Sequence, residues 1–205
     1  PEVELERGPF RDKAQMIRAM DQAGKMVVGY KLVDSFFGNI SYLYGDTLYI
    51  SQTSSSLDEL IGHIDPCPLD NSSCAGITAS SELPAHRDIL RKTGHLAVLH
   101  GHPKFSVIMS MDCDKRGDCD KEGECFRRCP EQRDVRGYPV VPGEVGTGPF
   151  GLCRTVPPAI EEDKGVIVYG HGVFNTGVRD FNQALQDMLD VERTCREEYL
   201  SRIGE

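Results

Sequence analysis

Short apolar runs bounded by glycine, proline and polar turns dominate the middle of the chain. Leu96–Leu99 has the length and partly β-branched composition of a buried strand, and Gly94 and Pro103 bracket it. Val166–Tyr169 is a second run of the same kind, followed at once by Gly170. The two runs predict core strands of a β-sheet.

A β-hairpin is predicted between residues 40 and 51. Ile40–Tyr44 and Thr47–Ser51 have strand-like composition, and Gly45-Asp46 between them is a two-residue turn signal. Val140-Val141 is predicted to form a further short strand. The proline-containing stretch Ile64–Ala79 is interpreted as a loop.

Apolar residues spaced three and four apart predict helices in three places. These helices run from Phe10 to about Lys31, from Ser81 to about Lys92 and from Asp180 to about Ile203. We expect Ser81 and Asp180 to cap the helices that they begin. The short stretch Leu57–Ile61 has a helix-like pattern as well. The buried stripe of the last helix is predicted to comprise Phe181, Leu185, Met188, Val191, Cys195 and Tyr199.

The composition is that of an ordinary globular protein. Its 205 residues suit one domain with a sizeable core, and 39% hydrophobic and 27% charged residues are typical values. The formal net charge of −9 argues against nucleic acid or an anionic membrane surface as the main partner. No apolar run has the length of a transmembrane helix, and the first residues show no signal-peptide pattern. A cytoplasmic location is therefore the expectation.

Histidines end both predicted core strands. His100 and His102 are two residues apart, so on a strand they project from the same face, roughly 6–7 Å from each other. His171 follows the second strand and has a glycine on either side. A single histidine is more often an ordinary, partly buried residue. Three of them at strand ends, however, favour a catalytic zinc site, in which three protein ligands leave the fourth position open.

Two polar residues precede the first histidine pair. Glu82 lies in the first turn of the helix predicted from Ser81, where the helix dipole favours an ionised carboxylate. First-turn acids are common, but one placed shortly before a two-histidine strand is a candidate general base. Asn39 follows Gly38 at the mouth of the hairpin, where an amide or the backbone could bind an anion.

Eight cysteines are many for a chain without a secretion signal, and they favour metal or redox use over a disulfide framework. Four of them fall within one short charged segment: Cys113, Cys119, Cys125 and Cys129. Four thiolates can form a tetrahedral metal site, although this spacing matches no zinc-ribbon or ferredoxin pattern. We favour a second metal site at these four cysteines. An iron–sulfur cluster, two disulfides and four free thiols are the alternatives.

Six landmarks occur in order along the chain. They are Gly38-Asn-Ile-Ser41, Ile50-Ser-Gln-Thr-Ser54, Ser80-Ser-Glu82, His100-Gly-His-Pro103, Gly170-His-Gly172 and the closing helix. Each is weak alone, but together they resemble the class II aldolase/adducin-head family, whose founding enzymes include L-fuculose-1-phosphate aldolase. The resemblance covers a single domain of residues 1–205, apart from a cysteine-rich insertion at about 112–130. It implies an α/β fold, a three-layer αβα domain with a central β-sheet, and a homotetramer with active sites between subunits.

The resemblance also implies roles for individual residues. His100, His102 and His171 match the ligands of Zn²⁺ or another divalent metal, and Glu82 matches the acid/base beside it. The positions that hold the substrate phosphate in the aldolases correspond to Asn39, Thr53, Ser54, Ser80 and Ser81. Two departures stand out. Phe36 replaces a phosphate-binding threonine, and the cysteine segment replaces the region that supplies a proton-donating tyrosine, for which Tyr138 is the nearest candidate.

The function implied is that of a zinc-dependent aldolase, a lyase that cleaves a small hydroxyketone, here a ketose phosphate, through a metal-stabilised enediolate. A pentulose-phosphate 4-epimerase, a decarboxylase or a dehydratase would share that chemistry, although the epimerases tend to carry aspartate at the position of Glu82. A non-catalytic adducin-like module would need neither Glu82 nor the three histidines. A redox or metal sensor that works through the cysteines is a further alternative.

Overall fold

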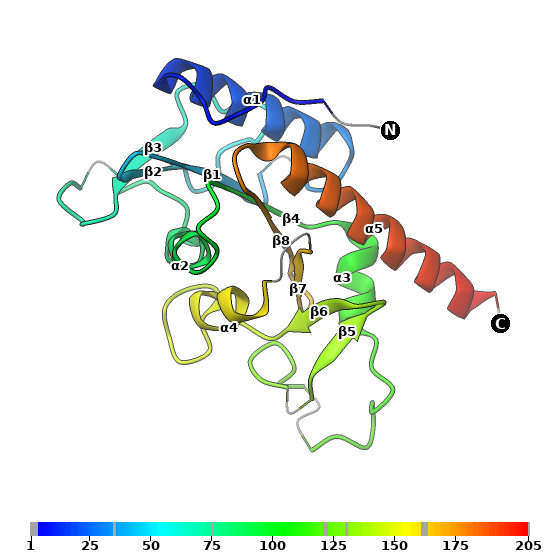
Figure 1. The fold of residues 1–205 in the computed structure, drawn as a ribbon. Coiled ribbons are helices and arrows are strands. Elements are labelled where there is room, and N and C mark those ends of the chain that lie inside the picture. The colour runs from blue at the N-terminus through cyan, green and yellow to red at the C-terminus, as the bar shows by residue number, and fades with distance from the viewer. Residues whose placement is uncertain are drawn as a thin grey trace.

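The computed structural model describes residues 4–34, 36–74, 76–120, 123–129, 131–160 and 164–204. Figure 1 shows the elements formed by these residues. The helices are α1 (Lys13–Gly29), α2 (Leu83–Thr93), α3 (Lys104–Met111), α4 (Leu152–Ala159) and α5 (Phe181–Ile203). The strands are β1 (Asn39–Tyr44), β2 (Thr47–Ser51), β3 (Ile64–Pro68), β4 (Ala97–Gly101), β5 (Arg133–Val135), β6 (Tyr138–Val141), β7 (Val166–Val168) and β8 (Gly172–Gly177).

The strands form one eight-stranded sheet of order β3-β2-β1-β4-β8-β7-β6-β5. Every neighbouring pair is antiparallel except β6 and β7, which run parallel. Strands β4 and β8, which come from distant parts of the chain, therefore lie side by side in the middle of the sheet. One end of this central pair carries residues that the sequence singles out.

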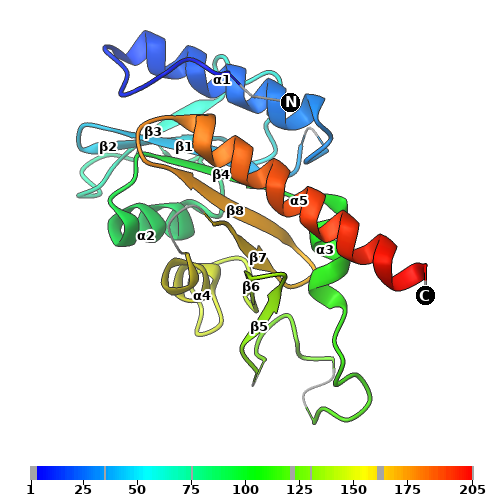
Figure 2. The same cartoon turned by 45° about the vertical axis from the view of Figure 1, so that its right-hand side comes forward.

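Helices cover both faces of the sheet (Figures 1 and 2). Helices α1 and α5 pack on one face over a core that includes Met20 and Met188, with α3 beside α5. Helices α2 and α4 pack on the other face over a second core that includes Ile89 and Val156. The predicted three-layer αβα architecture is therefore confirmed.

Strand β4 shows why a continuous apolar run predicted a buried strand. Leu99 belongs to the core under α1 and α5, whereas its neighbour Val98 belongs to the core under α2 and α4. Successive side chains of a strand point to opposite faces, so a strand covered on both faces needs apolar residues at every position. All five residues of β4 are buried.

The predicted α1, α2 and α5 are present, as are the hairpin β1–β2 and strands β4, β6 and β7. The stretch Ile64–Ala79 is not wholly a loop, because Ile64–Pro68 forms β3. Its prolines suggested a break, but β3 is an edge strand, and an edge strand tolerates residues without an N–H on its open side. Helix α4 and strands β5 and β8 were not predicted; α4 contains Pro157-Pro158 near its end.

Two smaller predictions were wrong. Leu57–Ile61 forms turns rather than a helix, and its apolar pattern arises because Leu57 and Leu60 are buried in the core. Ser81 does not cap α2: Glu82 occupies the N-cap position and makes no side-chain capping bond. Asp180 does cap α5, accepting a hydrogen bond from the Asn182 backbone.

The predicted cysteine-rich insertion lies between α3 and β5, and its residues 121, 122 and 130 fall outside the described ranges. The described part of residues 112–132 contains turns but neither helix nor strand. Among the described helices, none is both long enough and apolar enough to cross a membrane.

Candidate active site

Three neighbouring strands bring the singled-out residues together. The pairing of β1 with β4 sets Asn39 opposite His100, and the pairing of β4 with β8 sets His100 opposite Phe174. His102 follows β4 directly, and His171 lies in the short turn that joins β7 to β8. The three histidines therefore meet at one end of the central strands.

The imidazole groups of His100, His102 and His171 converge. One ligand nitrogen of each lies within 4.8 Å of the others, and in the described parts of the chain no other group of three His, Cys, Asp or Glu side chains does so. The Nε2 atoms of His100 and His102 are 3.0 Å apart. Two nitrogen lone pairs at that distance repel unless a proton or a cation lies between them. The donor set thus fits a divalent metal ion.

Strand β8 fixes the orientation of His100. The Nδ1–H of His100 donates to the backbone carbonyl of Val173 at 2.9 Å, which leaves the Nε2 lone pair facing the other histidines. The ring also stacks on Phe174, with centroids 4.1 Å apart and an interplanar angle of 20°. This tautomer and orientation are those that a metal ligand requires.

Glycine at position 172 is required by a close approach. A Cβ atom there would lie 2.2 Å from the Gly101 carbonyl oxygen and 2.6 Å from Cδ2 of His102. Any side chain would therefore push the turn that carries His171 away from the end of β4. The glycine after the histidine is thus part of the geometry of the cluster.

Glu82 is the acidic group of the site. It is buried, and its carboxylate oxygens lie 3.4 Å from Nε2 of His100 and 3.2 Å from Nε2 of His171. It also accepts a hydrogen bond from Nδ2 of Asn39 at 2.8 Å. Burial alone would raise the pKa of Glu82, but His100, His171 and the Asn39 bond outweigh it and lower the pKa overall. Glu82 is therefore ionised at neutral pH.

Buried hydrogen bonds connect Glu82 through Asn39 to His86 and Ser41. The side-chain oxygen of Asn39 can only accept, so Nε2 of His86 must donate to it, and Nδ1 of His86 then accepts from the Ser41 hydroxyl at 2.7 Å. The order of donation is Ser41 to His86, His86 to Asn39, and Asn39 to Glu82. His86 was not predicted from the sequence as part of the site. Its position four residues after Glu82, on the same face of α2, was the available signal.

Burial keeps His86, His100 and His102 neutral at neutral pH. It lowers the pKa of His100 from 6.5 to about 4 and the pKa of His102 to about 3, although the carboxylate of Glu82 opposes the shift. Burial also lowers the pKa of His86 to about 3. Neutral imidazole is the form that binds metal, so His100 and His102 are in the binding form at neutral pH.

The histidines and Glu82 line a pocket of about 220 Å³. Its lining also includes each of the predicted phosphate-binding residues, Asn39, Thr53, Ser54, Ser80 and Ser81. Phe36 and Phe37 form an exposed apolar part of the wall. No lysine or arginine is among the described lining residues. Hydroxyls and amides thus surround the polar part of the pocket.

Tyr138 and the four cysteines lie elsewhere. Tyr138 is on β6, packs against the core under α5 and hydrogen-bonds Thr194; burial raises its pKa. It does not line the histidine pocket of its own chain. Cys113, Cys119, Cys125 and Cys129 line a separate, larger hollow. Their sulfur atoms do not converge as the three histidine nitrogens do.

Comparison with protein-family models matches residues 18–199 to the Class II Aldolase and Adducin N-terminal domain. The chain belongs to this family. The resemblance drawn from the six sequence landmarks is thereby confirmed, and the histidine pocket is the candidate active site of a class II aldolase/adducin domain. A comparison with curated proteins found no match.

Solved structures of class II aldolase domains share the fold. The L-fuculose-1-phosphate aldolase from Thermus thermophilus superimposes with a TM-score of 0.71 at 22% identity, over 94% of this chain and 97% of that chain. YgbL from Escherichia coli, described as a putative aldolase/epimerase/decarboxylase, gives a TM-score of 0.71 at 17% identity, over 90% and 88%. A sugar-phosphate aldolase from Thermotoga maritima gives 0.62 at 18% identity, over 93% and 95%.

Proposed function

We propose that this class II aldolase/adducin domain is a metal-dependent aldolase that cleaves a small hydroxyketone, with a ketose phosphate as the substrate class. The observation that carries the proposal is the convergence of three histidines on an ionised Glu82 at one pocket. A scaffold or assembly module has no need of that arrangement, because burying an ionised carboxylate costs free energy unless the charge is used or compensated.

His100, His102 and His171 would hold the metal, for which zinc is the expected ion. A bound divalent ion acts as a Lewis acid toward the negative charge that develops on the substrate oxygens when the carbon–carbon bond breaks. Val173 and Phe174 would keep His100 in its ligand orientation through the bond and stacking described above. The rest of the chemistry is proton transfer and substrate binding by this chain's own groups.

Glu82 is the proton acceptor of the proposed reaction. In the cleavage direction its carboxylate takes the proton of the hydroxyl on the carbon that becomes the aldehyde. The O–H electron pair then forms the aldehyde carbonyl, and the electrons of the broken carbon–carbon bond stay with the ketone fragment, which takes up a proton. Asn39, held by His86, would keep the carboxylate aimed into the pocket.

The hydroxyl-bearing part of the pocket lining suits a phosphate. Thr53, Ser54, Ser80 and Ser81 supply these hydroxyls, and hydroxyl and backbone N–H donors can bind a phosphate without a lysine or arginine. The family resemblance leads us to expect a homotetramer, in which a neighbouring subunit would complete the pocket. The proton donor predicted at Tyr138 would then have to act from such a neighbour.

The proposal is tested with the zinc-loaded full chain and a panel of ketose 1-phosphates and their unphosphorylated ketoses. We expect release of dihydroxyacetone phosphate and an aldehyde from a phosphorylated member of the panel. Glu82→Gln should lower kcat by about 10²–10⁴-fold while the metal content stays the same. Cys74→Ser, in an exposed loop away from the pocket, is the matched control and should keep full activity.

Other products would redirect the proposal. Inversion at one carbon without cleavage would indicate an epimerase, and release of carbon dioxide from a keto acid would indicate a decarboxylase; both would contradict aldol cleavage. Metal binding without turnover of any substrate would contradict the enzymatic role itself and favour a binding module.

A further inference from the structure

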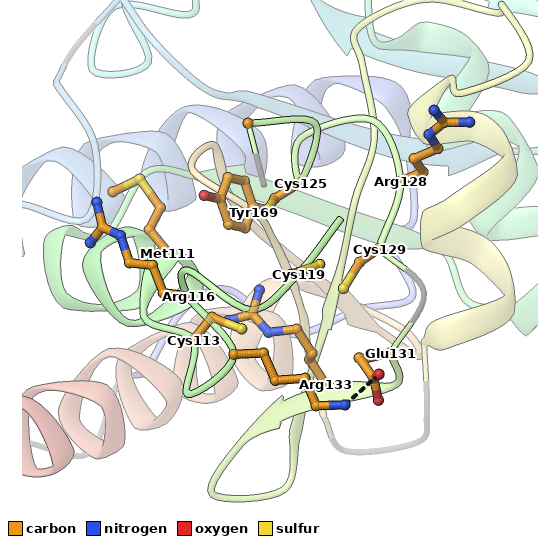
Figure 3. Close-up of a pocket in the computed structure, with 12 residues that line it drawn as sticks. Met111, Cys113, Arg116, Cys119, Cys125, Arg128, Cys129, Glu131, Arg133 and Tyr169 are labelled. Atoms are coloured by element: carbon orange, nitrogen blue, oxygen red, sulfur yellow. Dashed lines mark hydrogen bonds and ion pairs between the residues drawn. The ribbon is translucent and has the colours of Figure 1, made fainter. Parts of the chain in front are cut away.

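The hollow beside the cysteine segment is a second place where metal-binding side chains gather. Cys113, Cys119, Cys125 and Cys129 all line it, and its volume is about 490 Å³. Figure 3 shows the four cysteines around this hollow, with Cys125 beside Tyr169. The proposed aldolase reaction uses none of these thiols.

We propose that these four cysteines bind one structural Zn²⁺ ion, at a site separate from the histidine pocket. Four thiolates arranged as a tetrahedron are a common structural zinc site. Binding would form four S–Zn bonds, and the four thiol protons would pass to solvent. The spacing of five, five and three intervening residues matches neither the zinc-ribbon nor the ferredoxin pattern, so the preference for zinc rests on the folding and charge of the segment.

The described part of the cysteine segment has little regular structure or apolar packing to hold it in place. The described part of residues 112–132 has no helix or strand, and its large apolar side chain, Phe126, is 43% exposed. Such a stretch buries too little apolar surface to offset the conformational entropy lost when it is ordered. Long loops without regular structure are uncommon inside compact domains. A structural zinc ion supplies the missing free energy, because its binding is coupled to folding.

Positively charged side chains gather around the hollow. A zinc ion with four thiolates carries a net charge of −2, which positive groups nearby would stabilise. The hollow is lined by Lys115, Arg116, Arg128 and Arg133. Lys115 and Arg128 also pair with Glu131 and Glu124 at 2.6 Å, so their charge is shared. The guanidinium of Arg133 lies 5.8 Å from the centre of the Tyr169 ring, which fixes it on the wall of the hollow.

The four cysteines of the segment are only partly buried, unlike the two buried cysteines of the chain. Cys67 and Cys195 are buried in the two apolar cores, where they pack as small apolar residues. None of the cysteines in the described structure forms a disulfide. The four sulfurs of the segment surround the hollow rather than meet at one point. Binding would therefore bring the four sulfurs together, which is possible because the described residues of the segment form turns and not a helix or strand.

Closure of the segment would also affect the neighbouring turn. Tyr169 lines the hollow, and His171 lies two residues further along. The backbone N–H of Gly170 between them donates to the Ser110 hydroxyl on α3, at 2.8 Å, close to where the cysteine segment begins. A zinc ion held by the cysteines would brace this turn at Tyr169.

Metal content per chain tests the proposal directly. The full chain is produced with zinc and measured by elemental analysis, together with His100→Ala/His102→Ala, Cys113→Ser/Cys129→Ser and the control Cys74→Ser. We expect about two zinc ions in the wild type and in the control, and about one in each double variant. A wild-type zinc content that the Cys113→Ser/Cys129→Ser change leaves unaltered would overturn the proposal.

A second measurement needs no variant and stays informative if the cysteine variant fails to fold. The wild type is treated with an alkylating reagent with and without bound zinc, and the modified cysteines are located by mass spectrometry. Zinc should protect the four cysteines of the segment and leave Cys74 reactive. Equal modification in both samples, iron with sulfide in the purified protein, or native disulfides among the four would each overturn the proposal. This measurement reports only on the cysteines and not on the histidine site. The result of the measurement is therefore independent of the aldolase proposal.

Discussion

His100 belongs to the central strand β4, His102 follows that strand directly and His171 lies in the turn between β7 and β8, whereas the described residues of the cysteine segment form neither helix nor strand. His100 is buried, stacked on Phe174 and hydrogen-bonded to Val173 by contacts within the protein itself. The cysteine side chains surround a hollow and do not converge. The difference agrees with the two proposals: a catalytic site would have ligands oriented in advance, and a structural site would have ligands that its metal orders.

Loss of His100 should have the largest effect. His100→Ala removes a metal ligand and the partner of the Val173 carbonyl, so we expect activity to fall to background and the free energy of unfolding to drop by about 1–3 kcal/mol. Metal analysis and kinetics measure the loss of activity, and denaturant unfolding measures the loss of stability.

His171, which is partly exposed in its turn, is the comparison for the buried His100. His171→Ala should lose activity with a smaller loss of stability, and an equal stability loss in both would argue against the pre-oriented role of His100.

The pH dependence of stability should come from the buried histidines. The pKa of His86 is about 3 in the folded chain and near 6.5 when unfolded, so between these values the unfolded chain binds a proton that the folded chain does not. The free energy of unfolding of the metal-free protein should therefore fall as the pH drops below about 6.5, by up to about 1.4 kcal/mol per pH unit for each such histidine. Above that pH, His86 should contribute no slope.

The variant His86→Gln isolates this contribution. Its unfolding free energy should depend less steeply on pH between 6.5 and 4.5 than that of the wild type, as measured by denaturant titration at each pH. Its kcat should also fall, because Asn39 loses the partner that orients it toward Glu82. Identical pH slopes in the two proteins would mean that His86 is not held neutral by the fold.

A smaller effect is expected at the hydroxyl-lined wall. Ser81→Ala should raise KM for a phosphorylated substrate about tenfold, the equivalent of one hydrogen bond to a charged group, and leave KM for the unphosphorylated sugar unchanged. Ser55→Ala is the matched control, because the Ser55 hydroxyl donates to the Gln52 carbonyl and does not line the pocket. A KM change that is the same for both substrates would contradict phosphate binding at this wall.

The smallest effect is expected at Tyr138. Its hydroxyl hydrogen-bonds Thr194 on α5, and it does not line the histidine pocket of its chain. Tyr138→Phe should therefore change kcat by less than about threefold and reduce the free energy of unfolding by about 1 kcal/mol. Steady-state kinetics at saturating substrate decide the point. A fall in kcat comparable to that of Glu82→Gln would restore Tyr138 as a proton donor supplied by a neighbouring subunit.

Much of the fold could be predicted because its patterns are local. The apolar stripes of α1 and α5 and the continuous apolar run of β4 reflect burial that each element requires by itself. Strand β3 was missed because Pro66 and Pro68 mark a break in any local pattern. Only its place at the open edge of the sheet makes those prolines acceptable.

The site could be predicted to the extent that its residues fall into short motifs. Glu82, the three histidines and each of the predicted phosphate-binding residues line one pocket, as the motifs suggested. His86 could not be assigned in this way, because its role lies in bonds to Asn39 and Ser41 on another element. Asn39 was predicted to bind an anion. In the structure its amide also donates a hydrogen bond to the carboxylate of Glu82, a contact that was not predicted.

The sequence by itself determined which side chains end the strands and on which side they point, since the alternation of residues along a strand is a property of the local backbone. It also determined that residues 112–132 carry thiols and charge but little apolar surface. Only the tertiary structure decided that His171 reaches His100 and that Asn39 reaches His86. Both meetings depend on the pairing of β1, β4 and β8 and on the packing of α2, and these form between distant segments because burial of both sheet faces stabilises that one register.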